Sequence, residues 1–155
     1  MKYILTLTVN GLPAEALVSP TDTLLDVLRN QLGITSSKRG CDSGDCGACT
    51  VLLDGKPVRA CLTIALTATG KKVVTVEGLS RNGRLHALQE SFIEHGAAQC
   101  GFCTPGMLMS AVSLLEMNPH PQREEMAEYM SGNLCRCGCY EEIIEAILAL
   151  NRNED

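Results

Sequence analysis

The chain has 155 residues, a formal net charge of -5 at pH 7 and nine cysteines. Its length corresponds to one domain or two small ones, and its composition, 45% hydrophobic and 20% charged, excludes a disordered chain. The Lys and Arg residues are scattered, which argues against nucleic-acid binding, and no apolar run approaches the ~20 residues of a membrane span. The first residues also lack the continuous apolar stretch of a signal peptide, so a cytoplasmic protein is expected.

The first half of the sequence predicts a small β-sheet with one helix. Apolar side chains alternate over residues 3–9, and Asn10-Gly11 then supplies a two-residue hairpin turn. Leucines recur at helical spacing after candidate caps at 21–23, until Gly33 ends the helix. The remaining predicted strands are 14–18, 50–53, 57–60 and 72–76. A hairpin, a helix and further strands in this order predict a β-grasp domain within an α+β chain.

The second half predicts four helices behind a short connector. Residues 78–84 carry Gly, Asn and Ser, so we place the domain boundary there, with a first domain of 1–77 and a second of 85–155. The predicted helices are 85–95, 104–117, 123–131 and 141–150. Thr104 is expected to cap the second helix, with Pro105 at its first helical position. Short connections between these helices predict a four-helix bundle.

The nine cysteines divide into two groups. Their odd number and the missing export signal argue against a disulfide framework, and clustered cysteines in a reducing compartment favour metal ligands. The first group is Cys41, Cys46, Cys49 and Cys61, and the second is Cys100, Cys103, Cys135, Cys137 and Cys139. Each half of the chain therefore holds one predicted site. Because each half is small for a hydrophobic core alone, a metal centre would also stabilise the fold.

The first group has the spacing C-x4-C-x2-C, followed by the distant Cys61. This is the spacing of plant-type ferredoxins, which hold a [2Fe–2S] cluster on four thiolates. Glycines at positions 40, 44 and 47 permit a tight loop and the close backbone approach that N–H···S hydrogen bonds need. A structural zinc site and buried free cysteines are the less favoured alternatives.

The second group combines a C-x2-C pair, Cys100 and Cys103, with C-x-C pairs before the last predicted helix. Four thiolates at one end of a helical domain suit either zinc or an iron–sulfur cluster, because C-x2-C pairs serve both. Eight cysteines satisfy two clusters, so one of Cys135, Cys137 and Cys139 is spare. Both Cys135/Cys137 and Cys137/Cys139 preserve a C-x-C pair, and spacing does not choose between them.

Two segments of the second half closely resemble a known family. Residues 99–106 and 132–137 resemble the second-cluster motifs of the small iron–sulfur subunits of molybdenum hydroxylases, and residues 41–61 match the family's first motif. This is the family of xanthine dehydrogenase, aldehyde oxidoreductase, carbon monoxide dehydrogenase and 4-hydroxybenzoyl-CoA reductase. The resemblance covers nearly the whole chain. The sequence departs from it at Gly138-Cys139, where the family usually has Thr-Gly before the tyrosine that Tyr140 matches.

The resemblance implies a β-grasp ferredoxin domain followed by a four-helix domain, each with one [2Fe–2S] cluster. It assigns the cluster proximal to molybdenum to Cys100, Cys103, Cys135 and Cys137, and the distal cluster to Cys41, Cys46, Cys49 and Cys61. Electrons would pass from a molybdopterin cofactor in a large subunit through both clusters, and usually on to FAD in a medium subunit. Gln99 and Cys137 occupy positions that lie against the pterin in this family, and the implied assembly is a dimer of heterotrimers.

The expected function is therefore that of an electron-transfer subunit of a molybdopterin-dependent oxidoreductase. No Ser/His/Asp or Cys/His catalytic set stands out, so the chain is expected to perform no bond-making chemistry itself. We expect a partner surface around Gln99, Gly101, Phe102 and Arg136. A freestanding two-cluster ferredoxin and a zinc-stabilised interaction module are the alternatives. Cys139, which the resemblance leaves free, is expected either to have a lowered thiol pKa at a helix N-terminus or to be buried and inert.

Overall fold

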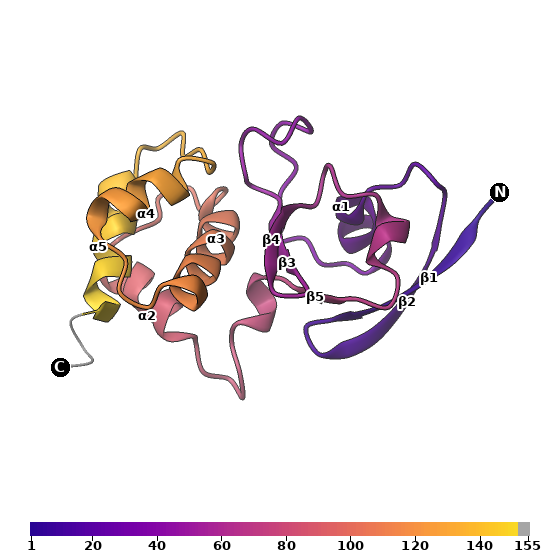
Figure 1. Ribbon diagram of the computed structural model, residues 1–155, viewed down its shortest axis with the longest axis horizontal. Coiled ribbons are helices and arrows are strands. Elements are labelled where there is room, and N and C mark those ends of the chain that lie inside the picture. The colour runs from indigo at the N-terminus through magenta and orange to yellow at the C-terminus, as the bar shows by residue number, and fades with distance from the viewer. Residues whose placement is uncertain (152–155) are drawn as a thin grey trace.

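The computed structural model describes residues 1–151 and divides the chain into two lobes that lie side by side (Figure 1). The first lobe contains a five-stranded sheet with one short helix, and the second contains four helices. The α+β class is confirmed. Within residues 1–151, no helix has the length and apolar character that crossing a membrane would require.

The sheet of the first lobe has the strand order β2-β1-β5-β3-β4. Its strands are β1 (Tyr3–Val9), β2 (Leu12–Val18), β3 (Thr50–Leu53), β4 (Lys56–Arg59) and β5 (Lys72–Val74). β1 and β5 pair in parallel, and the other neighbouring strands are antiparallel. Asn10 and Gly11 form the predicted hairpin turn with φ angles of 52° and 83°, as a tight turn between right-twisted strands requires. β5 ends two residues earlier than predicted, because the chain turns into a 3-10 helix, Val76–Gly78.

The helix of the first lobe packs its apolar side on the sheet. It begins as α1 (Leu24–Asp26) and continues as a wider π-helical turn, Val27–Gln31. Thr23 and Asp26 form a capping box, in which each side chain accepts a hydrogen bond from the other residue's backbone N–H. The fully buried side chains are Leu24, Leu25, Val27 and Leu28. The helix predicted after 21–23 is confirmed, and Gly33 follows it with a φ of 69°.

All four helices predicted for the second half are present. They are α2 (Ala87–Glu94), α3 (Thr104–Met117), α4 (Arg123–Met130) and α5 (Tyr140–Asn151). α2 begins later than predicted, because His86 caps it by accepting a hydrogen bond from the Leu88 N–H at 3.2 Å. The prediction that Thr104 caps α3 is wrong. Cys103 occupies that position, Thr104 is the first helical residue, and its buried hydroxyl has no hydrogen-bond partner.

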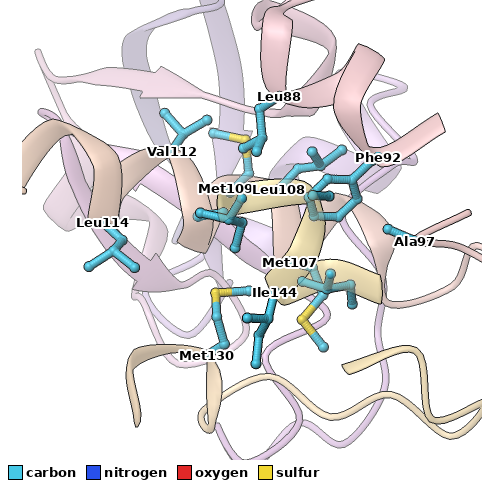
Figure 2. Close-up of a cluster of buried hydrophobic side chains, with 14 of the residues drawn as sticks. Leu88, Phe92, Ala97, Met107, Leu108, Met109, Val112, Leu114, Met130 and Ile144 are labelled. Carbon is cyan, nitrogen blue, oxygen red and sulfur yellow. The ribbon is translucent and has the colours of Figure 1, made fainter. Parts of the chain in front are cut away.

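α3 lies on the side of the second lobe that faces the sheet, and it joins the core of the second lobe to the first lobe (Figure 1). Figure 2 shows the buried side chains around this helix, among them Met107, Leu108 and Val112. α3 also packs against β3, whose Leu52 belongs to the same hydrophobic cluster. The two lobes are therefore held together by direct packing as well as by the chain between them.

Candidate functional site

Both cysteine groups lie on loops at the border between the two lobes. The first loop follows the helix of the first lobe and adopts positive φ angles at Asp42, Gly44 and Gly47. At Gly40, an added Cβ would lie 2.7 Å from the Cys46 Sγ. The glycines thus allow this loop to curl closely around its own thiols, as the sequence predicted. Cys61 joins the group from the end of β4.

The first group forms two thiol pairs with different surroundings. Cys41 is exposed and interacts with Cys46, whereas Cys49 and Cys61 are buried and interact with each other. Weaker interactions of Cys46 with Cys49 and of Cys61 with Cys41 join the two pairs into one group. The Cys41 Sγ accepts hydrogen bonds from the Ser43 and Cys46 N–H groups at 3.4 Å each. The Ser43 side chain and these N–H groups lower the pKa of Cys41 to about 6. Burial, together with a hydrogen bond to Cys49, raises the pKa of Cys61 to about 12.

The second group repeats this arrangement in the helical lobe. Cys100 interacts with Cys137, and Cys103 interacts with Cys135. A hydrogen bond from the Phe102 N–H lowers the pKa of the exposed Cys100. Burial raises the pKa of Cys103 to about 12. Each predicted site therefore combines one thiol pair that includes an exposed cysteine with one pair that lies deeper.

The ninth cysteine, Cys139, lies behind Cys135 in the core of the helical lobe. It is 2% exposed, and its N–H donates to the Cys135 Sγ at 3.5 Å. Burial raises the pKa of Cys139, so the expected lowering of its pKa by a helix N-terminus is wrong. The surroundings of Cys139 agree with the other expectation, a buried thiol.

The donor set fits a [2Fe–2S] cluster at each site. A cluster of this type is bound by four cysteine thiolates, and each site offers four thiols in two pairs, with backbone N–H groups directed at sulfur. In the part of the chain that the structure describes, no three His, Cys, Asp or Glu side chains are arranged to hold a single metal ion. All nine cysteines are free thiols.

A cavity of about 660 Å³ opens between the two cysteine loops. Its lining residues are Gly40, Cys46, Ala48, Cys100, Phe102, Cys103, Leu134, Cys135, Arg136 and Tyr140. Phe102, Leu134 and Tyr140 are large side chains that remain 47%, 54% and 39% exposed, which marks an uncovered apolar surface beside the second site. Of the two predicted pterin contacts, Gln99 is exposed just outside this lining and Cys137 is half-buried.

Sequence reasoning missed the residues that connect the two loops. Arg59 at the end of β4, Gly106 in α3 and Asn133 before Cys135 all lie where the loops meet. Gly106 and Asn133 lie within the two segments that resemble the family, but no local pattern indicates their role, because each of the three residues acts through a contact with a segment far away in the sequence. For Arg59, the only available signal was its position two residues before Cys61.

Comparisons with known proteins agree with this geometry. Residues 7–72 match the family described as a 2Fe-2S iron-sulfur cluster binding domain, and residues 75–148 match a [2Fe-2S] binding domain. The nicotine 6-hydroxylase small subunit of Paenarthrobacter nicotinovorans is 54% identical over 140 residues, which is 90% of this chain and 84% of that subunit. The nicotinate dehydrogenase small FeS subunit of Eubacterium barkeri is 45% identical over 146 residues, 94% of this chain and 93% of that subunit.

Solved structures show the same likeness. A chain in the crystal structure of quinoline 2-oxidoreductase from Pseudomonas putida 86 superposes with a TM-score of 0.93 at 50% identity, over 99% of both chains. The aldehyde oxidoreductase from Desulfovibrio gigas gives a TM-score of 0.91 at 42% identity, over 99% of this chain and 18% of that one. The chain therefore belongs to the family of electron-transferring iron–sulfur subunits, with two [2Fe–2S]-binding domains, of the molybdenum hydroxylases.

Proposed function

We propose that this chain carries electrons between the molybdenum site of a large molybdopterin-binding subunit and an acceptor, usually FAD in a medium subunit. The observation that supports this most directly is the presence of two four-thiol sites on adjoining loops. Each cluster, when bound, takes up and releases single electrons. The chain itself is not catalytic, and we propose that it works in the cytoplasm within a dimer of heterotrimers.

The proposed ligands follow the thiol pairs. Cys41, Cys46, Cys49 and Cys61 would hold the distal cluster, and Cys100, Cys103, Cys135 and Cys137 would hold the proximal cluster. The second set is supported by the interactions of Cys103 with Cys135 and of Cys100 with Cys137. Cys139 also interacts with Cys135, so the choice of Cys135 and Cys137 over Cys139 rests on the resemblance to the family. We also propose that the first domain, residues 1–77, is a β-grasp domain and that the second, residues 85–155, is a four-helix bundle, with 78–84 as linker.

The protein's own contribution to the reduction potentials lies in hydrogen bonds and burial. N–H groups that point at sulfur stabilise negative charge, and so favour the reduced form of an iron–sulfur centre. Ser43 and Cys46 supply such groups to Cys41 in the first loop. Although burial opposes it, hydrogen bonds from the N–H groups of Cys139 and its neighbours lower the pKa of Cys135 in the second loop. Because the two sets differ, we expect two spectroscopically distinct clusters.

The surface beside the second site is proposed to receive the large subunit, with Gln99 and Cys137 against the pterin. We expect Arg136→Glu to weaken this assembly, because Arg136 is exposed between two proposed ligand cysteines and lines the cavity between the loops. A reversed charge at an interface typically costs several kcal/mol through like-charge or unpaired contacts. Size-exclusion chromatography and iron content measure the result. Full assembly of the Arg136→Glu chain would remove this residue from the proposed surface.

Cys139→Ser is expected to keep all iron and both cluster signals. Its thiol is buried behind Cys135, and the resemblance to the family leaves it outside the eight proposed ligands, although it too interacts with the Cys135 side chain. Cys135→Ser is the matched comparison, because it makes the same change four residues earlier in the same loop, and it should lose the proximal cluster. Iron analysis with electron paramagnetic resonance distinguishes the two variants. The reverse result would assign Cys137/Cys139 as the ligand pair.

Isolation of the intact complex tests the proposed function. Iron and acid-labile sulfide should be present in equal amounts, and both cluster signals should appear when an oxidisable substrate is added. The relatives named for nicotine, nicotinate and aldehydes suggest N-heteroaromatic compounds and aldehydes as the first substrates to try. A chain that purifies alone from its host and exchanges electrons with soluble carriers would instead be a freestanding ferredoxin.

A further inference from the structure

A backbone hydrogen bond joins the two cysteine loops directly. One of its residues is a proposed ligand, and the other is the neighbour of a proposed ligand. The Leu134 N–H donates to the backbone oxygen of Cys46 at 2.8 Å. Leu134 is followed in the chain by Cys135, so this single hydrogen bond joins the backbone of one site to that of the other. Any movement of one loop away from the other would lengthen this connection.

The guanidinium of Arg59 lies where it can hold both loops at once. Nη1 donates to the Thr50 Oγ1 at 2.7 Å, and Nε donates to the Gly44 oxygen at 3.3 Å, both on the first-site side. Nη2 donates to the Gly132 oxygen at 2.6 Å, on the second loop. At Gly132, an added Cβ would lie 2.7 Å from Nη2, so the second loop approaches Arg59 as closely as a glycine allows.

Three different nitrogens of the guanidinium serve the three acceptors, which explains why an arginine is suited to this position. Its planar group offers donors in a fixed fork, whereas a lysine offers one compact ammonium group. Other polar contacts continue the junction on the same side. The Asn133 Nδ2 donates to the Gly47 oxygen at 3.1 Å, and the Ser110 hydroxyl donates to the Asn133 Oδ1 at 2.8 Å.

We propose that Arg59 is a positioning residue for electron transfer between the two clusters, because it fixes the first cysteine loop against the second. The inference rests on the proposed function. In the step concerned, one electron leaves one site and arrives at the other, no covalent bond changes, and substrate oxidation in the complex supplies the electron. The Arg59 guanidinium makes no hydrogen bond to any of the eight proposed ligand cysteines. It acts by holding together the two loops that carry these cysteines.

The experiment compares Arg59→Met and Arg59→Lys with Arg39→Met in the intact complex. Arg39 is a matched control, because its guanidinium also lies beside the first loop but pairs with Asp26 and Asp42 of the same lobe. Iron content, hydrogen exchange at the Leu134 amide, and the rate at which the distal cluster is reduced after substrate is added are measured in each variant.

Arg59→Met should retain its iron. Exchange at the Leu134 amide should become on the order of 10-fold faster, because the loss of a charge-assisted hydrogen bond weakens the closed arrangement by about that factor. Reduction of the distal cluster should slow while reduction of the proximal cluster does not. Arg59→Lys should follow Arg59→Met in both measurements, and Arg39→Met should match the wild type.

Wild-type exchange and wild-type transfer rates in both Arg59 variants would overturn the proposal. Loss of iron from both Arg59 variants would also overturn the proposal. Arg59 would then be needed to form one cluster site, and not to position the two sites relative to each other. Reduction of both clusters by substrate in the wild-type complex tests the proposed function separately, so the failure of one idea is distinguishable from the failure of the other.

Discussion

Serine in place of Cys103 is expected to remove one cluster signal and about half of the iron, while the other signal persists. Serine in place of Cys46 should do the reverse. Both results follow from the thiol pairs, since Cys103 interacts with Cys135 in the second lobe and Cys46 with Cys41 in the first. The removal of one thiol from a four-thiol site leaves the other site with all its donors.

Iron analysis and electron paramagnetic resonance of the reduced protein measure these losses. Cys139→Ser serves as the control, because it introduces the same change into a buried cysteine that is not among the eight proposed ligands. Transfer through the complex should stop in either ligand variant, since each cluster is a step of one series. Loss of both signals in Cys46→Ser would show instead that the two sites form only together.

Alanine in place of Gly106 is expected to destabilise the protein although the position is helical. Helix propensity alone favours alanine over glycine by about 1 kcal/mol. The added Cβ would, however, lie 2.3 Å from the backbone oxygen of Gly47, which is itself fixed by hydrogen bonds from Thr50 and Asn133. Overpacking of this kind costs about 1–3 kcal/mol, so we expect the thermal unfolding midpoint to fall by about 5 °C.

Gly55→Ala provides a comparison for this variant. Gly55 has a φ of 80° and no neighbour that an added Cβ would meet, so its replacement strains the turn between β3 and β4 without touching the other lobe. Only Gly106→Ala should also accelerate hydrogen exchange at the Leu134 amide. A raised midpoint in Gly106→Ala would show that the two lobes separate easily enough to accept the methyl group.

The sequence was most informative where function depends on local spacing. Short stretches of sequence were enough to predict the C-x4-C-x2-C loop, the hairpin turn at Asn10-Gly11 and the apolar face of α3. The structure contains all three features. The cap of α3 was misassigned, because Thr104 looks like a cap when the turn that places Cys103 there is unknown. Arg59 could not be found in this way, since its significance comes from the Gly132 oxygen, 73 positions further along the chain.

The way α3 packs on β3 has a consequence for how this unit occurs in nature. Leu52 of the sheet shares a cluster with the helices, and the Gly106 and Gly47 backbones meet without side chains between them. The contacts that set the mutual arrangement of the two lobes therefore lie within this chain. Such a unit can be inherited whole, either as a separate gene product or as a fused portion of a longer polypeptide. The 99% of this chain that superposes on 18% of the Desulfovibrio gigas chain is an example of the fused form.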